Sequence, residues 1–428
     1  MTPLLAGFAQ ADISPRIGTR KIGWLKVIVP TRVLDPLRAK AAVVDSPRGG
    51  RIAIVALDTL FVREDTVARI RARAARRFGI PPGRLMVAAT HNHAGPACAD
   101  CGDVATAPRY LARMEAGILE ALGLAVAGLE PAEWGPARVF ESGVAHNRRI
   151  VMRDGTARTH GRLMDPDAAG FEGPVDPELS VLAFRGAGGG APLGLIAHFA
   201  CHPAHHGGDR AFSAGFPGVV AARLREWPVT LWLNGAQGDL HTGDPATGAD
   251  PSMAETGRRM ALSVRRALAR VTWAEAAATG GAATTIVLPF RRATPAQVAG
   301  TVRGAQRFVD PAIYDRAMPG LLAELGRSHG RRAEFQALRL GGEALVSLPG
   351  EFFAELGLAV KARSRPWHVL PVGLANGNVG YVPTRGAHAR GGYETTFGPT
   401  SALAPGAGGL ALSAAVAAIR RLGRPERP

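Results

Sequence analysis

Long apolar runs are missing from this chain of 428 residues. A membrane-spanning helix needs roughly 18 or more consecutive apolar residues. No such run occurs, so we expect no transmembrane segment. The first residues also lack the basic segment and the long apolar segment of a secretory signal. We therefore expect the chain to work in the cytoplasm.

Lysine is also scarce, because it supplies only four of the 51 basic residues. The formal net charge of +16 is therefore carried almost entirely by arginine. No dense basic helix with interleaved aromatic residues occurs, so nucleic acid is not expected as a partner. A diffuse positive field would still favour peripheral contact with an anionic membrane surface, or an acidic substrate.

The composition is typical of a large α/β protein. Apolar residues make up 46% of the chain, and 54 glycines and 32 prolines indicate many tight loops. Strands are predicted over 37–44 and 51–58, and helices over 63–78, 107–128, 215–226, 251–271 and 408–422. We therefore predict an α/β fold of mixed β-sheets flanked by α-helices, as a single domain over residues 1–428. A helical insertion is expected over about 294–329, with breaks at Pro295, Pro311 and Pro319.

Two histidines follow the apolar run 85–88, in the sequence Thr90-His91-Asn92-His93, and a Gly-Pro turn comes next. In an extended chain, side chains at positions i and i+2 point to the same side. Neutral imidazole is a favoured zinc ligand, so His91 and His93 predict a metal site at the end of a strand. The pattern is also compatible with a pair of hydrogen-bonded loop histidines.

Four further apolar runs end in polar residues. The run 193–197 leads into a segment with four of the twelve histidines, at positions 198, 202, 205 and 206. The other three runs lead to His241, to Pro349-Gly350-Glu351, and to Tyr381 followed by Gly391-Gly392-Tyr393-Glu394. Ligands of α/β proteins gather beyond the ends of strands. These side chains are therefore expected to form one site.

The order and spacing of these motifs resemble the catalytic domain of the neutral (alkaline, non-lysosomal) ceramidases, zinc amidases that cleave N-acyl sphingoid bases. The resemblance extends from residues 7–15 to residues 397–399 and covers nearly the whole chain. It implies bound Zn²⁺ and a lipid or small-molecule N-acyl substrate. The zinc ligands that it implies are His91, His202, Glu351 and Tyr381. The residues that it places at the substrate carbonyl and the developing oxyanion are His93, Arg148 and Tyr393.

Two departures from the family pattern concern the substrate. His241 stands where the ceramidases usually have a serine that contacts the substrate, and the sequence ends before the C-terminal β-sandwich that many of them carry. Both departures favour a second hypothesis, a zinc hydrolase of the same fold that acts on an ester, a lactone or a cyclic amide. The motifs do not determine the acyl length, the amine or the oligomeric state.

Elementary zinc chemistry agrees with the implied roles. Zinc held by two histidines, a glutamate and a tyrosine keeps a position open for water. The ion lowers the pKa of that water from ~15.7 toward ~7. A guanidinium and a phenol directed at the carbonyl oxygen would stabilise the tetrahedral intermediate. His93 or His241 would carry a proton to the leaving amine.

A third hypothesis is a non-catalytic protein that binds zinc only for folding. Cys98 and Cys101 form a C-x-x-C pair close behind the two histidines. Together with His91 and His93 they would make a compact structural site. A redox role for the cysteines needs a βαβ context that the sequence does not show.

Three of the implied site residues also have ordinary structural interpretations. Glu351 would suit the N-terminus of a helix over residues 352–356, where a carboxylate is favourable. Tyr381 would fit a half-buried strand. Arg148 would fit surface charge in an arginine-rich chain.

Overall fold

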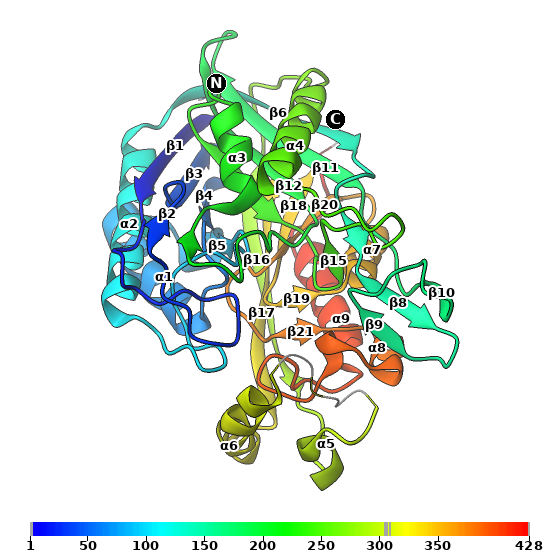
Figure 1. The fold of residues 1–428 in the computed structure, drawn as a ribbon. Helices are drawn as coiled ribbons and strands as arrows, with labels where there is room; N and C mark the ends of the chain where they lie inside the picture. Colours follow the sequence, from blue (N-terminus) through cyan, green and yellow to red (C-terminus); the bar gives the residue numbers. More distant parts are fainter. Residues whose placement is uncertain (1–2, 304–306, 308–309, 427–428) are drawn as a thin grey trace.

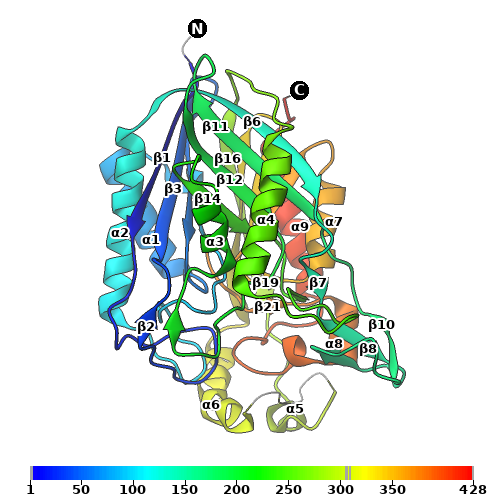
Figure 2. The ribbon, with the colours of Figure 1, turned by 45° about the horizontal axis from the view of Figure 1, so that its top comes forward.

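The computed structural model describes residues 3–303, 307 and 310–426. Two β-sheets lie face to face, and helices cover their outer surfaces (Figure 1, Figure 2). The first sheet has the strand order β14 (Thr230–Asn234), β12 (Pro192–Phe199), β11 (Glu178–Gly186), β6 (Glu130–Phe140), β1 (Leu5–Asp12), β3 (Arg38–Ser46), β4 (Gly50–Leu57) and β5 (Leu85–Ala89). The second has the order β16 (Thr279–Pro289), β17 (Gly330–Leu340), β18 (Glu343–Leu348) and β20 (His368–Gly373).

Four layers result from the way these elements bury their apolar faces. Side chains of both sheets, among them Ile54, Leu231, Leu345 and Leu370, form the core between them. The outer face of the first sheet is covered by α1 (Glu64–Phe78), α2 (Pro108–Ala127), α3 (Gly215–Arg223) and α4 (Met253–Leu268). The outer face of the second is covered by α7 (Ala354–Arg363) and α9 (Ala407–Arg420). The prediction of mixed sheets flanked by helices is confirmed.

Local sequence explains the central elements. β4 is apolar at every position from Ile52 to Leu57, as expected for a strand that is buried on both faces. α1 ends at Gly79, whose φ of 64° provides the left-handed cap that glycine adopts without strain. α4 begins with a capping box, in which Ser252 and Glu255 each accept a hydrogen bond from the other's backbone N–H.

Shorter elements complete the chain. The short strands are β2 (Arg32–Val33), β7 (His146–Asn147), β8 (Arg149–Met152), β9 (Ala157–Thr159), β10 (Ala168–Phe171), β13 (Ala211–Phe212), β15 (Leu240–His241), β19 (Glu351–Phe352) and β21 (Tyr381–Val382). The short helices are η1 (Pro82–Arg84), α5 (Pro295–Ala299), α8 (Arg385–Arg390) and η2 (Tyr393–Thr395). Among the described residues, no helix combines the length and the apolar character that crossing a membrane requires.

The expected insertion contains α5 and α6 (Pro311–Arg327), which lie between β16 and β17, while residues 304–306 and 308–309 are outside the described part. The expected break at Pro319 is wrong, because α6 continues through it. An internal proline removes one backbone hydrogen bond and strains the helix. Met318 and Leu321, which lie before and after Pro319, are buried in one apolar cluster, and this packing stabilises the helix.

The carboxyl ends of strands from both sheets converge at one place. β4 and β5 run parallel, as do β12 and β14, and β18 and β20. At the end of β14, Asn234 Nδ2 donates to the Thr90 carbonyl just beyond β5 (3.3 Å). The backbone N–H of Ala89 donates to the Leu374 carbonyl just beyond β20 (3.2 Å). Residues that follow these strands are therefore brought together.

A buried histidine joins the two sheets. His198 on β12 lies 2.8 Å, through its Nε2, from the Pro371 carbonyl on β20, so Nε2 donates. Its Nδ1 is buried without a hydrogen-bond partner in the described structure. Burial lowers the pKa of His198 to about 4, and the ring is neutral in the folded protein at physiological pH.

Because the His198 ring is neutral in the folded protein, we predict that the free energy of unfolding decreases in acid. An unfolded histidine titrates near pH ~6.5, so between that pH and about 4 the unfolded state binds more protons. The stabilisation is therefore complete above pH ~6.5 and is lost as the pH falls. As the pH falls through this window, the free energy of unfolding of the parent should decrease more than that of His198→Gln, by on the order of 3 kcal/mol. Urea unfolding at several pH values measures this difference. The exposed His368, changed to Gln, is the matched control. An unchanged pH slope in His198→Gln would contradict the prediction.

Candidate metal centre

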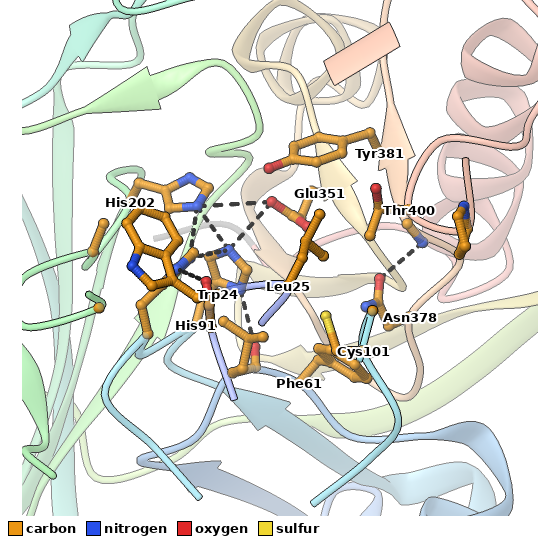
Figure 3. Close-up of a pocket in the computed structure, with 18 of the residues that line it drawn as sticks. Trp24, Leu25, Phe61, His91, Cys101, His202, Glu351, Asn378, Tyr381 and Thr400 are labelled. Atoms are coloured by element: carbon orange, nitrogen blue, oxygen red, sulfur yellow. Dashed lines mark hydrogen bonds and ion pairs between the residues drawn. The ribbon is translucent and has the colours of Figure 1, made fainter. Parts of the chain in front are cut away.

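Three histidine rings meet where the strand ends converge (Figure 3). His91 and His93 follow β5, and His202 follows β12. The Nε2 atoms of His91 and His202 lie 2.9 Å apart, those of His91 and His93 3.3 Å, and those of His93 and His202 3.0 Å. Zinc bound tetrahedrally by nitrogen at ~2.0–2.1 Å holds its ligand atoms about 3.3 Å apart. The triangle therefore has the size of three corners of a zinc site.

The other nitrogen of each ring contacts a backbone carbonyl. His91 Nδ1 lies 3.0 Å from the Leu60 oxygen, His93 Nδ1 2.8 Å from the Gly23 oxygen, and His202 Nδ1 3.2 Å from the Gln237 oxygen. A carbonyl only accepts, so each Nδ1 carries the ring proton and each Nε2 presents an unshared pair. Three unshared pairs at these distances repel one another, and a cation placed among them removes the repulsion. The donor set fits a divalent metal ion such as zinc.

Protonation of His93 and His202 does not compete with metal binding. Burial, together with the neighbouring His91 ring, holds the pKa of both His93 and His202 well below its ordinary value. Both rings therefore stay neutral at physiological pH, which is the form that binds metals. His93, which was expected to face the substrate, is grouped by its geometry with the two histidines expected to hold the ion.

The rings of His91 and His93 converge for a different reason from the one expected. His91 has a φ of 64°, so residues 91–93 are not extended. The resulting turn brings the two rings edge to face, with centroids 4.8 Å apart. Asn92 fixes this turn: its backbone N–H donates to the Thr59 carbonyl (3.0 Å), and its Oδ1 accepts from the Ala94 N–H (2.9 Å). These bonds offset the strain of a left-handed non-glycine residue.

Glu351 and Tyr381 approach the cluster from a separate two-stranded sheet, β19–β21. They are direct partners in the parallel pair β19–β21. Both line the same cavity (Figure 3). Glu351 Oε2 lies 3.2 Å from His91 Nε2 and 3.8 Å from His202 Nε2, and it is buried without a hydrogen-bond partner in the described part of the chain. An unpartnered buried carboxylate oxygen is costly, and a cation among the histidines would satisfy it.

The ordinary structural interpretations of three residues are wrong. Glu351 does not lie in the first turn of a helix, because α7 begins at Ala354. Tyr381 is only 4% exposed and contacts the cavity rather than a solvated sheet face. Arg148 is also only 4% exposed, which excludes a role as surface charge.

Arg148 is held by a buried hydrogen-bond network. Its Nε donates to Glu394 Oε1 (2.7 Å), and its Nη2 donates to the Gly238 carbonyl (2.9 Å) and to Tyr381 Oη (3.2 Å). Burial alone would raise the pKa of Glu394, but the neighbouring Arg149 and Arg148 lower it to about 2. Among the described residues, Arg148 Nη1 has no hydrogen-bond partner, so it is available to a ligand in the cavity that Arg148 lines.

Glu394 lies in a motif that was expected at the site, but the sequence implied no role for it. Its carboxylate binds both Arg148 and Arg149 and accepts a hydrogen bond from Thr159 Oγ1 (2.7 Å). The available signal was its position directly after Tyr393 in the Gly-Gly-Tyr-Glu motif. The partners lie about 245 residues away in sequence, so the ion pairs themselves could not be inferred.

The cluster lies in the wall of a cavity of about 1920 Å³. Pockets for small molecules usually measure ~300–1,000 Å³, so this one has room for a long substrate. Seven of the twelve histidines line it: His91, His93, His160, His202, His205, His206 and His241. Apolar lining comes from Leu60, Phe61, Ile313, Leu321 and Val379.

His241 and Tyr393 also line the cavity. The His241 ring meets the His160 ring edge to face, with centroids 4.9 Å apart. Burial and the neighbouring His160 lower the pKa of His241 to about 3. Its Nδ1 accepts from the Gly243 N–H (2.9 Å), so its Nε2 carries the proton and donates. Burial raises the pKa of Tyr393, so its phenol remains protonated and can also donate.

The cysteines do not join the histidines. Cys98 Sγ lies 3.1 Å from both the Phe61 carbonyl and Thr59 Oγ1. Burial raises the pKa of Cys98, and that of Cys101 to about 12, so neither is a thiolate at neutral pH. In the described part of the chain, the group of donors that all lie close to one another consists of the three histidines, and neither cysteine belongs to it. The compact site of His91, His93, Cys98 and Cys101 is not formed.

We expect one divalent metal ion per chain and a strong dependence on all three rings. His91→Ala, His93→Ala and His202→Ala should each lower metal occupancy at least tenfold, because each removes one imidazole ligand of a converging set. Elemental analysis of the purified variants, with circular dichroism to confirm the fold, measures this. The matched control is the double variant Cys98→Ser with Cys101→Ser, which should keep its metal. Full occupancy in His93→Ala would remove His93 from the ligand set.

No protein-family model matches the sequence, and no curated protein matches it significantly. Solved structures do match. A ceramidase complexed with C2 aligns with a TM-score of 0.75 at 18% identity, covering 100% of this chain and 77% of the ceramidase. The neutral ceramidase from Pseudomonas aeruginosa aligns with a TM-score of 0.75 at 20% identity, covering 100% of this chain and 76% of that enzyme. The chain therefore has the fold of the neutral ceramidases, as the order of its sequence motifs predicted.

Proposed function

We propose that this chain is a zinc-dependent hydrolase that cleaves the amide bond of an N-acyl lipid or a related N-acyl amine. One observation carries the proposal. Three histidine Nε2 atoms and an unpartnered carboxylate oxygen converge in the wall of a large cavity, beside a buried guanidinium with a free donor. This combination suits metal-assisted hydrolysis of a carbonyl compound.

In this proposal His91, His202, Glu351 and Tyr381 hold the metal, with His93 as a further donor. A bound zinc ion supplies an activated water and polarises a carbonyl. A purely structural ion is closed off by its protein ligands, whereas a catalytic ion keeps an open position. Here the cluster borders a cavity, and His93 is only partly buried. Access of this kind supports catalysis over a folding role.

Arg148 and Tyr393 act on the oxygen of the scissile carbonyl. The charge of Arg148 is permanent, and Glu394 and Gly238 hold its guanidinium in place before substrate binds. Donors that are fixed in advance stabilise the developing oxyanion without reorganisation. The protonated Tyr393 phenol provides the second donor. Its backbone is fixed by a hydrogen bond from the Tyr393 N–H to Thr159 Oγ1 (3.0 Å).

His241 contacts the leaving group in this proposal. With a pKa of about 3, His241 is almost entirely neutral at physiological pH, so it is a poor general acid. It contributes a hydrogen bond from Nε2–H instead. The same observation favours a second candidate substrate class, an ester, lactone or cyclic amide, whose leaving oxygen or ring carbonyl accepts such a bond.

A substrate panel with parallel metal analysis tests the proposal. The protein, with its metal content measured, is assayed on N-acyl amines of short and long acyl chain, and on matched esters, lactones and cyclic amides. Hydrolysis of N-acyl amines that disappears on chelation and returns with zinc supports the amidase. Hydrolysis of only the oxygen esters or lactones would support the second substrate class instead. A metal-bound protein that hydrolyses neither class contradicts both.

Removal of an oxyanion donor should affect turnover and leave the metal in place. We expect Arg148→Ala and Tyr393→Phe each to lower kcat by about 10²–10³, with KM changed much less. Steady-state kinetics on the best substrate of the panel measures this, with zinc content determined for each variant. Arg153→Ala, in the turn after β8, is the matched arginine control. If both variants turned over the substrate as fast as the parent, neither residue would take part in the reaction.

His241→Ser should change substrate preference rather than metal binding. The serine hydroxyl is shorter and both donates and accepts, whereas His241 only donates into the cavity. We expect the ratio of kcat/KM between two amine leaving groups, one with and one without a hydroxyl, to change about tenfold, the value of one hydrogen bond of ~1.4 kcal/mol. An unchanged ratio would place His241 outside the leaving-group site.

A further inference from the structure

A loop near the N-terminus concentrates exposed apolar residues. Of the 15 large apolar side chains that are exposed in the described part of the chain, six lie within residues 16–34, called here the docking loop. They are Ile17, Trp24, Val27, Val29, Val33 and Leu34. A concentration of exposed apolar side chains of this kind indicates an interaction surface.

The same loop is basic throughout. Residues 16–34 contain five basic residues and no acidic residue. The side chains of Arg16, Arg20, Lys26 and Arg32 form no ion pair or hydrogen bond with any described residue. The flanking carboxylates are already engaged, because Asp12 pairs with Arg38 and Arg113, and Asp35 accepts from Ser213 Oγ (2.6 Å). The loop therefore presents uncompensated positive charge beside its apolar side chains.

The docking loop borders the cavity of the metal centre. A bridge between Lys21 and Ile28 closes a hairpin with Trp24 and Lys26 near its tip. Gly23, Trp24, Leu25 and Lys26 line the cavity, and Figure 3 places Trp24 and Leu25 beside the histidines. A molecule that leaves a surface bound to this loop thus enters the cavity directly.

We propose that the docking loop binds the surface of an anionic lipid bilayer. Tryptophan and short aliphatic side chains insert into the boundary between headgroups and acyl chains, while Lys and Arg contact lipid phosphates and carboxylates. Each basic side chain near an anionic leaflet contributes about 1 kcal/mol. The net charge of +16 adds long-range attraction to the same surface. Binding to the bilayer does not depend on the reaction proposed for the metal centre.

Vesicle sedimentation of the full chain tests this surface. The probes are vesicles of phosphatidylcholine alone and of phosphatidylcholine with phosphatidylserine. One double variant removes apolar contact, Val27→Ser with Val29→Ser. These side chains are two residues apart and away from the cavity lining. The other reverses charge, Arg16→Glu with Arg32→Glu. Phe140→Ser and Arg270→Glu change an apolar and a basic exposed residue elsewhere and are the matched controls.

The parent chain should bind vesicles with phosphatidylserine more tightly than phosphatidylcholine alone, and binding should weaken with salt. Each double variant should lower the partition coefficient about tenfold or more, and the controls should match the parent. Hydrolysis of a water-soluble, short-chain substrate should be unchanged in the double variants, which separates this test from that of the proposed function. Absence of vesicle binding, or equal binding by all variants, would overturn the proposal. A dimer of the parent that both double variants dissociate would instead identify a self-association surface and would equally overturn it.

Discussion

The site depends on three hydrogen bonds that direct the histidine rings. Each Nδ1–H donates to the carbonyl of a different segment, at Leu60 beyond β4, at Gly23 in the docking loop and at Gln237 beyond β14. The bonds fix the tautomer as well as the orientation, so all three unprotonated nitrogens face one point. Two of these carbonyls follow strands of the first sheet, β4 and β14, and the third lies in the docking loop. The candidate metal centre is therefore a property of the layered fold rather than of one loop.

Charge around this point is arranged in matched pairs. Arg148 and Arg149 share Glu394, and Glu351 lies beside the histidine nitrogens that would hold a cation. Buried ion pairs rarely add net stability, because desolvation costs about as much as the attraction returns. The network instead holds the Arg148 guanidinium at a fixed place on the cavity wall, with one nitrogen left for a ligand. Such pre-positioning is what stabilisation of a developing oxyanion requires.

The sequence predicted the positions of the strand ends well and the contacts between them poorly. Apolar runs with a polar end are visible locally and indicated the segments of the site, and the resemblance to the ceramidases then implied His91, His202, Glu351 and Tyr381 as ligands. The grouping of His93 with the metal donors depends on a left-handed backbone conformation at His91. Residues other than glycine rarely adopt this conformation, and the hydrogen bonds of Asn92 hold His91 in it. The partnership of Glu394 with Arg148 spans 246 residues and leaves no local pattern. Tertiary contacts decide both features.

Gly23 connects the docking loop to the candidate metal centre through a direct hydrogen bond. Gly23 has a φ of 130°, and an added Cβ would clash with the His93 carbonyl oxygen, so only glycine fits there. Its own carbonyl accepts the His93 proton, and the next residue, Trp24, belongs to the docking loop. A hairpin that moved freely would carry the His93 acceptor with it. The buried Lys21 prevents this, because its Nζ donates to the His206 carbonyl (2.7 Å) and pairs with Asp209 (3.7 Å). A surface that contacts lipid can therefore lie beside a metal site without disturbing its ligands.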